Sequence, residues 1–321
     1  MNNYSKVQQI LHQIALSSRL LREISFDLEK IVFFDEKFKL SDNHVFISGL
    51  ARSGTTILLN AVYETKQFAS LTYQDMPFIL SPNFWSKLSL KNFVFTKQER
   101  AHKDGIKIDI NSAEAFEEVF WMTFDYKKAE TFFEFNSFIQ LLCMKYNKKR
   151  YLSKNNQNIH KIDFLIKNYP NSKILIPFRE PLQHAFSLLH QHKRFIYLQK
   201  KDDFIRKYMS WIGHIEFGID YVHDTYDNII YDNTYELNHW IEQWYLSYNA
   251  LKKFKNSKNI YFISYEKLCT DNLVFRSILD FLNVDSKLNF DFQESKKEIN
   301  ISFDAELYDK SVSIYKELND R

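Results

Sequence analysis

Short apolar runs alternate along this chain with longer stretches in which apolar residues recur at helical spacing. Apolar runs that predict buried strands lie at 45–47, 68–72, 173–178 and 259–264. Helical spacing is found at 4–31, 132–146, 159–168, 182–192, 202–226, 234–255 and 273–282, and a further helix is expected to begin at Ser112. Strands and helices in succession are typical of a parallel sheet with helices on its faces. The pattern therefore predicts an α/β fold, with residues 151–156 as a polar loop.

The same pattern suggests one domain over residues 1–321. An N-terminal helical extension is expected at 1–40 and a helical insertion at 195–257, since neither repeats nor low-complexity tracts divide the chain. The N-terminal helical stretch has two interpretations, a packing helix in front of the main fold or a helix on a membrane surface. Both remain open at this point.

Composition narrows the class of protein. A formal net charge of +3 is too small to indicate nucleic acid as a partner. Two cysteines give neither a disulfide framework nor a metal cluster, which favours a reducing compartment. The N-terminal stretch is interrupted by charges, so it predicts neither a signal peptide nor a membrane span. We expect a soluble, cytoplasmic protein whose oligomeric state the sequence does not fix.

The most informative stretch is VFISGLARSGTTILLN, residues 45–60. An apolar strand breaks at Gly49 into a loop that ends at Gly54, and the residues that follow begin a helix whose N–H groups and dipole can hold an anion. The glycine spacing matches G-x-x-x-x-G-K-[ST], but Thr55 replaces the lysine. Arg52 supplies a cation inside the loop instead, with a planar fork suited to a group with several oxygens. A P-loop-type, three-layer fold is the resulting expectation.

A second strand-to-helix junction, KILIPFREPLQHAFS, adds another candidate anion site. Arg179 ends the strand, Pro181 begins the helix, and Ser187 lies eight residues after the arginine. Ligand crevices of parallel sheets lie at the carboxyl ends of the strands, so Arg179 and Ser187 are placed to hold a phosphate there. Two anion sites in one crevice suit a nucleotide with phosphates at both ends of its ribose.

These residues carry a family resemblance: the chain resembles sulfotransferases that use 3′-phosphoadenylyl sulfate. The matching segments lie in family order between residues 45 and 268. Leu50 to Thr56 resembles the family's P-R-S-G-T-T loop, and Arg179-Glu180-Pro181 with Ser187 resembles its 3′-phosphate motif. Tyr151 to Asn155 resembles the lysine loop of the bacterial and Golgi-type branches, and Ile263 to Leu268 resembles the family's strand followed by Y-E-[DE]-L. Ala51 departs from the pattern, and the R-K-G nucleotide loop of the cytosolic animal branch has no counterpart. We expect the segment from Glu294 to Lys297 to take the place of that nucleotide loop.

The resemblance implies transfer of a sulfuryl group from 3′-phosphoadenylyl sulfate, without a metal, to a hydroxyl or amine. The nucleotide-binding residues that it implies are Arg52, Ser53, Gly54, Thr55, Thr56, Arg179, Ser187, Tyr265 and Lys296. Charge that builds on the departing phosphate would be stabilised by Arg52 and the helix N–H groups. Lys154 is expected to touch the sulfate or to be a solvated loop charge.

Proton removal from the acceptor requires a base. The resemblance points to Asp75, whose alternative role is to cap a turn before Pro77. Reserve candidates are Glu114, Glu118, His102 and His184. The acceptor is expected to be a small molecule or glycan. A bacterial surface carbohydrate is favoured, since the resemblance is to bacterial and Golgi-type branches and aromatic residues in the segment 81–112 can stack on sugars. Two other functions stay open, a P-loop kinase or NTPase and a non-catalytic module that binds a nucleotide or anionic glycan.

Overall fold

A computed structural model describes residues 4–88, 98–99, 107–223 and 229–320 of the chain. Its centre is a four-stranded parallel sheet in the order β4-β1-β5-β6. The strands are β1 Val45–Ile47, β4 Leu152–Lys154, β5 Lys173–Phe178 and β6 Ile260–Ser264. The short strands β2 Gln98–Glu99 and β3 Lys107–Ile108 pair antiparallel as a separate ribbon.

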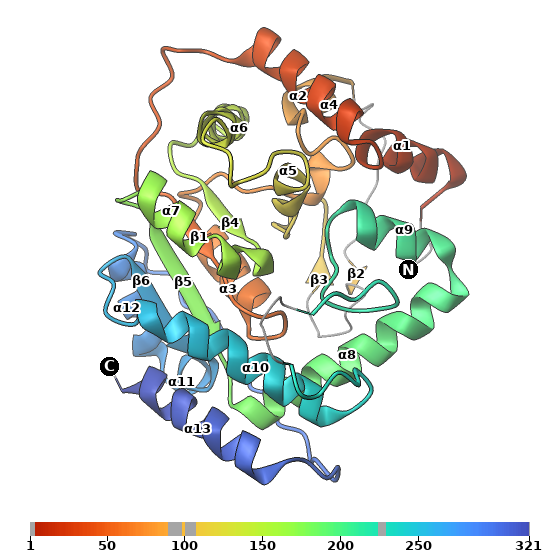
Figure 1. Ribbon diagram of the computed structural model, residues 1–321. Helices are drawn as coiled ribbons and strands as arrows, with labels where there is room; N and C mark the ends of the chain where they lie inside the picture. The colour runs from red at the N-terminus through yellow and green to blue at the C-terminus, as the bar shows by residue number, and fades with distance from the viewer. Residues whose placement is uncertain (1–3, 89–97, 100–106, 224–228, 321) are drawn as a thin grey trace.

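Alternation along β1 explains why the sheet is covered on both faces. Val45 and Ile47 face one core with helices α3 Thr55–Tyr63 and α12 Asn272–Phe281, whereas Phe46 faces another core with α6 Thr131–Lys145 and α10 Leu237–Leu251. All three strand residues are fully buried. Helix, sheet and helix thus form three layers, as Figure 1 shows. The predicted α/β class with a central parallel sheet is confirmed.

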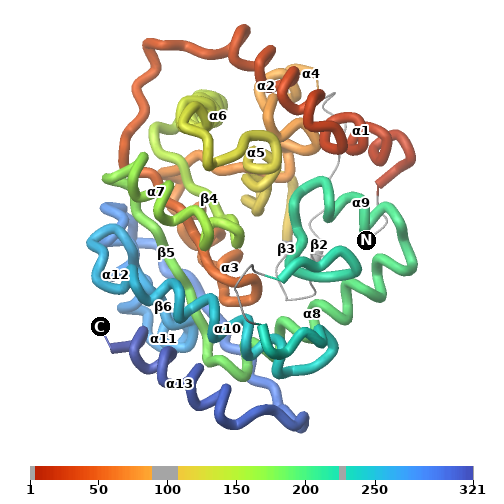
Figure 2. Tube along the Cα trace, in the orientation of Figure 1, coloured from red at the N-terminus to blue at the C-terminus, as the bar shows by residue number. Residues whose placement is uncertain are grey.

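The remaining helices surround this centre, and Figure 2 follows the chain through them. They are α1 Lys6–Leu16, α2 Arg19–Phe33, α4 Pro82–Leu88, α5 Glu118–Trp121, α7 Ile162–Asn168, α8 Pro181–Lys201, α9 Asp203–Trp211, α11 Tyr265–Thr270 and α13 Ala305–Asn319. Short 3₁₀ turns occupy Tyr73–Asp75, Asn156–His160 and Lys252–Phe254. A third apolar cluster joins α8, α9 and the start of α10 to Ala51 of the loop after β1.

Four local expectations were wrong. Residues 68–72 pair with the sheet only through a bridge between Ala69 and Tyr151, because the chain then turns away into a 3₁₀ turn. The predicted loop at 151–156 instead begins with β4, whose parallel register is set by β1. The helix expected from Ser112 begins only at Glu118, and the expected helix over 202–226 ends at Trp211.

Several predictions from the sequence are not tested by the described structure. Much of segment 81–112 and His102 lie outside the described residues, although Pro82–Leu88 is helical as α4. The single-domain organisation, with its extension at 1–40 and insertion at 195–257, remains a prediction, as does the cytoplasmic location. Across the described ranges, no helix has both the length and the apolar character needed to cross a bilayer.

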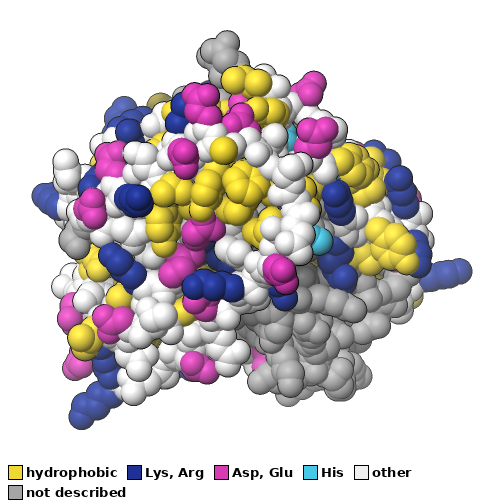
Figure 3. All heavy atoms as spheres, turned by 90° about the horizontal axis from the view of Figure 1, so that it is seen from below, with side chains coloured by type: hydrophobic (Ala, Val, Ile, Leu, Met, Phe, Trp, Pro, Cys, Tyr) yellow, Lys and Arg dark blue, Asp and Glu magenta, His cyan; other side chains and the backbone are white. Residues whose placement is uncertain are grey.

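On the face shown in Figure 3, basic and acidic side chains are interspersed rather than gathered by sign. This distribution agrees with the small net charge of +3. A nucleic-acid-binding face would need a basic stripe to track a phosphate backbone. The view gives no support to such a partner.

Candidate active site

The loop between β1 and α3 has the backbone of an anion cradle. Arg52 and Gly54 adopt positive φ values of 70° and 99°, and α3 begins at Thr55. A Cβ atom on Gly54 would lie 2.4 Å from Cδ2 of Tyr265, so only glycine allows both the left-handed turn and the packing of that ring. The first turn of α3 therefore presents its N–H groups beside an aromatic wall.

His184 holds this loop in place through a hydrogen bond to its backbone. Its Nε2 donates to the carbonyl oxygen of Ala51 at 2.8 Å, and the ring is fully buried in α8. Burial, with the nearby charges of Arg179 and Arg52, lowers the pKa of His184 to about 3. A neutral, buried imidazole that donates to the backbone positions the loop and is unsuited to remove a proton from a substrate.

Two arginines interlock around the cradle. Arg52 Nε donates to Ser187 Oγ at 3.3 Å. Arg179 Nη1 donates to the carbonyl oxygen of Arg52 at 3.4 Å, and its Nη2 donates to that of Ser295 at 3.2 Å. The buried Nε of Arg179 has no hydrogen-bond partner within the described part of the chain. Ser187 thus contacts Arg52 directly, and the expected role of Arg179 and Ser187 in holding a phosphate stays a prediction.

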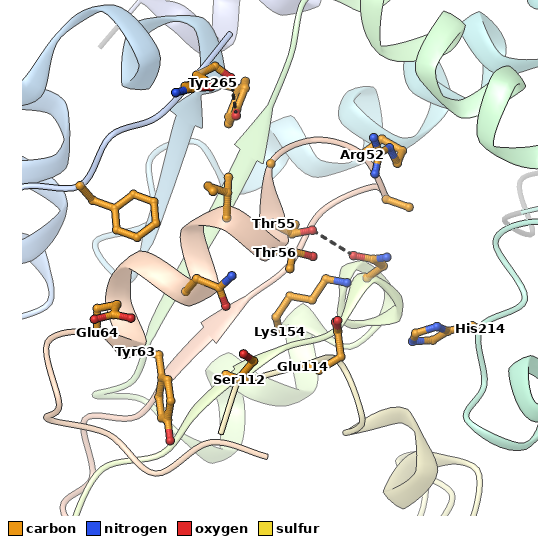
Figure 4. A pocket seen from close by; sticks show the side chains of 18 of the residues that line it. Arg52, Thr55, Thr56, Tyr63, Glu64, Ser112, Glu114, Lys154, His214 and Tyr265 are labelled. Carbon is orange, nitrogen blue, oxygen red and sulfur yellow. Dashed lines mark hydrogen bonds between the residues drawn. The ribbon is translucent and has the colours of Figure 1, made fainter. Parts of the chain in front are cut away.

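A cavity of about 770 Å³ opens in front of these groups. The cradle wall contributes Arg52, Gly54, Thr55, Thr56, Lys154, Arg179 and Tyr265. In Figure 4, Lys154, Thr56 and Glu114 point toward a common space, with His214 beyond them. Lys154 is 6% exposed at the end of β4. Of the two predicted roles for Lys154, this position favours contact with an anion over a solvated loop charge.

Glu114 is the reserve base candidate that lines this cavity. The antiparallel bridge between Thr72 and Ala113 brings the residue to the site. Its Oε2 accepts from the Tyr73 hydroxyl at 3.0 Å, and its Oε1 accepts from the backbone N–H of Ala115 at 2.9 Å. Both bonds orient the carboxylate at the cavity wall.

Asp75 has a different setting. It is fully buried and is not among the described residues that line the cavity. Its Oδ1 accepts from Lys145 Nζ at 2.5 Å, and its Oδ2 accepts from Tyr146 Oη at 2.8 Å and from the Thr72 N–H at 2.7 Å. These contacts favour the turn-capping alternative over the role of base.

Five other candidates also lie apart from the described cavity wall: Lys296, Glu118, Ser53, Ser187 and His184. Lys296 is exposed and pairs with Glu294 at 3.3 Å, while the neighbouring Ser295 lines the cavity. Glu118 pairs with Lys161 Nζ at 3.0 Å, and burial raises the pKa of its carboxyl group. Ser53, a residue of the loop itself, is fully buried.

Sequence reasoning missed several residues of the cavity wall. Asn156 accepts from the Thr55 hydroxyl at 3.4 Å and donates to Glu216 at 2.9 Å, so it links the cradle to the segment after α9. His214 donates through Nε2 to the carbonyl oxygen of Ala115 at 3.1 Å. Asn156 could have been found from the sequence, because it directly follows the lysine loop. No local sequence pattern predicts that His214 and Glu216 line the cavity.

Metal ligation has little support in this arrangement. Within residues 4–88, 98–99, 107–223 and 229–320, no group of three or more His, Cys, Asp or Glu side chains is placed to hold a metal ion. Anion binding by the helix N-terminus, two arginines and a lysine is what the cradle wall offers.

Fold and site together define an α/β protein with a P-loop-type anion cradle at the carboxyl end of β1. A family model described as "Sulfotransferase family" matches residues 44–287, which is most of the chain. The chain therefore belongs to the sulfotransferase family. No curated protein gives a significant match to its sequence.

Solved structures to which the chain is similar include two mycobacterial sulfotransferases. STF1 from Mycobacterium tuberculosis H37Rv is 13% identical over 96% of this chain and 80% of its own, with a TM-score of 0.48. STF9 from Mycobacterium avium is 13% identical over 93% and 74%, with a TM-score of 0.44. A mouse sulfotransferase, SULT7A1, complexed with PAP, is 15% identical over 88% and 68%, with a TM-score of 0.35.

Proposed function

We propose that this protein transfers a sulfuryl group from 3′-phosphoadenylyl sulfate to a hydroxyl or amine of a small-molecule or glycan acceptor. The observation that carries the proposal is that Arg52, Lys154 and Arg179 line the same cavity as the first residues of α3, in a chain of the sulfotransferase family. A P-loop kinase or NTPase is disfavoured because Thr55 occupies the position of the phosphate-binding lysine.

The donor set fits a ligand with two separate anionic groups. Helix N–H groups at Thr55 and Thr56 with Arg52 and Lys154 suit the phosphosulfate end. Arg179, whose buried Nε has no hydrogen-bond partner among the described residues, suits the second phosphate. Bound 3′-phosphoadenylyl sulfate supplies an electrophilic sulfur atom and a phosphate leaving group. Arg52 and Lys154 stabilise the negative charge that develops as the acceptor atom bonds to sulfur and the bond from sulfur to the phosphate oxygen breaks.

We assign Glu114 as the group that accepts the acceptor's proton. Its carboxylate lines the cavity that Lys154 also lines, and the bonds from Tyr73 and Ala115 fix its orientation. A positioned carboxylate contributes roughly 10² to 10⁴ in rate as a base. The ring of Tyr63, partly exposed on the cavity wall, can stack on a sugar face, which is compatible with a carbohydrate acceptor.

Nucleotide binding tests the donor assignment. We expect 3′-phosphoadenosine 5′-phosphate to raise the melting temperature equally with and without a chelator, because cations of the protein hold both phosphates. ATP should have little effect. Stabilisation by ATP alone, dependent on magnesium, would refute sulfuryl transfer and favour the kinase or NTPase alternative.

Activity tests the base. A screen of hydroxyl- and amine-bearing small molecules and glycans with labelled donor identifies an acceptor, and also tests the non-catalytic alternative. Glu114→Gln should then lower turnover by roughly 10² to 10⁴ while leaving nucleotide binding intact. Glu64→Gln is the matched control, since Glu64 also lines the cavity but at the far end of α3. Near-normal turnover of Glu114→Gln would remove the base from this position.

A further inference from the structure

The two N-terminal helices carry an apolar face that the rest of the described chain leaves uncovered. Ten of the twenty exposed large hydrophobic side chains among the described residues come from residues 7–34. They are Val7, Ile10, Ile14, Leu20, Leu21, Ile24, Leu28, Ile31, Val32 and Phe34. This concentration in so short a segment distinguishes the face from ordinary scattered surface residues.

The helices are apolar on two sides. Their inner side packs on the protein through Leu16 and Phe26, which are almost fully buried. On the outer side, positions 7, 10 and 14 of α1 and positions 21, 24, 28 and 31 of α2 alternate spacings of three and four residues. This spacing is the seam by which one helix packs on another. Figures 1 and 2 show α1 and α2 along an outer edge of the molecule.

The area of the face matches a protein interface. The ten side chains are each 38% to 79% exposed. At roughly 150–200 Å² per large side chain they expose on the order of 900 Å², against about 800 Å² per partner in a standard interface and about 300–600 Å² in the largest patch of a typical monomer. A face of this size, left in water, would be costly.

The charges around the face favour a protein over a membrane. Residues 1–40 contain six Lys or Arg and five Asp or Glu, and no tryptophan. Lys30 pairs with Asp27 at 3.1 Å and Glu134 at 2.6 Å, and Arg19 pairs with Glu23 at 2.8 Å. A helix that lies on anionic lipid needs an excess of basic residues at the edge of its apolar face. Here the basic side chains of Lys30 and Arg19 are paired with acidic ones, so their charges are offset.

We propose that this face, residues 7–34 of α1 and α2, is the interface at which two copies of the chain form a two-fold symmetric dimer. An aliphatic seam without a charge at its centre is complementary to itself, and an isologous interface requires such self-complementarity. Apolar character is also greatest in homodimer interfaces.

Light scattering after size exclusion, on the full chain, tests the proposal. The wild-type protein should have twice the mass of one chain. Ile24→Lys and Leu28→Lys should each shift it to the single-chain mass while the far-UV circular dichroism spectrum stays that of the wild type, because both side chains are about half exposed in the single chain. The matched control is Leu273→Lys on α12, which is 70% exposed and should stay dimeric.

Three outcomes would overturn the dimer. One is a single-chain mass for the wild-type protein at every concentration. Another is a dimer that survives Ile24→Lys and Leu28→Lys combined. The third is flotation of the wild-type protein with phosphatidylcholine and phosphatidylserine vesicles that the same substitutions abolish, since this would assign the face to a membrane.

Discussion

Asp75→Asn separates a structural role of this carboxylate from a catalytic one. The side chain is fully buried, and the side chain of Lys145, its partner at 2.5 Å, is only 9% exposed. Removing one member of a buried ion pair costs about 3–5 kcal/mol, because the other charge is left uncompensated. Asparagine keeps an oxygen that can accept from the Thr72 N–H, so we expect a loss of about 3 kcal/mol in the free energy of unfolding, near the lower end of that range.

Urea unfolding monitored by circular dichroism measures this loss. The double variant Asp75→Asn with Lys145→Met should be about 1–3 kcal/mol more stable than the sum of the single changes predicts, because it leaves no unpaired charge. Asp163→Asn is the control for a carboxylate-to-amide change. Its ion pair with Lys253 is exposed, and we expect at most about 0.5 kcal/mol.

A different result would refute this reasoning. If Asp75→Asn unfolded at the wild-type urea concentration and still bound nucleotide, yet had lost turnover, the carboxylate would be the base after all. Glu114→Gln would then be expected to keep near-normal turnover. Measuring both variants with one acceptor therefore distinguishes the two assignments.

Three further predictions concern the cradle and two buried histidines. Gly54→Ala should lower the free energy of unfolding by at least about 1–2 kcal/mol, because the φ of 99° at this position disfavours a side chain. Adding Tyr265→Ala should recover part of that loss in urea titrations. An unchanged free energy of unfolding for Gly54→Ala would contradict the close packing of Gly54 against Tyr265. Stability should fall as pH drops below about 6.5, since burial lowers the pKa of His184 to about 3 and that of His44 to about 4, so the unfolded chain binds more protons in this window. A urea midpoint constant from pH 7 to 5 would contradict it. Arg179→Ala should weaken binding of 3′-phosphoadenosine 5′-phosphate about 10- to 100-fold in calorimetric titration, with a smaller effect on turnover at saturation; unchanged affinity would remove Arg179 from the phosphate site.

Several parts of the fold and site could be predicted because their causes are local. The loop from Gly49 to Gly54 needs a strand before it, a left-handed turn and a helix after it, and each leaves a mark within a few residues. The junction at Arg179 is similar, because Pro181 begins a helix after an apolar strand. Both cradle arginines were therefore found from sequence.

The rest depended on partners far away in the chain. Asp75 looked like a base because sequence does not show that Lys145, seventy residues later, would neutralise it. Lys154 lies on a strand of three residues with no periodicity of its own, and only pairing with β1 fixes it at the cavity. Short strands gain their hydrogen bonds from neighbours, so their position cannot be read locally.

The sequence by itself determined the class of fold, the anion cradle and the family of the chain, since each follows from contiguous patterns of apolar, glycine and basic residues. Tertiary structure alone decided which of the two carboxylates considered as the base, Glu114 or Asp75, lines the cavity. Glu114 is delivered by a bridge between Thr72 and Ala113, and Asp75 is withdrawn by a buried ion pair. Both outcomes depend on hydrogen bonds and charges that meet only after the chain has folded.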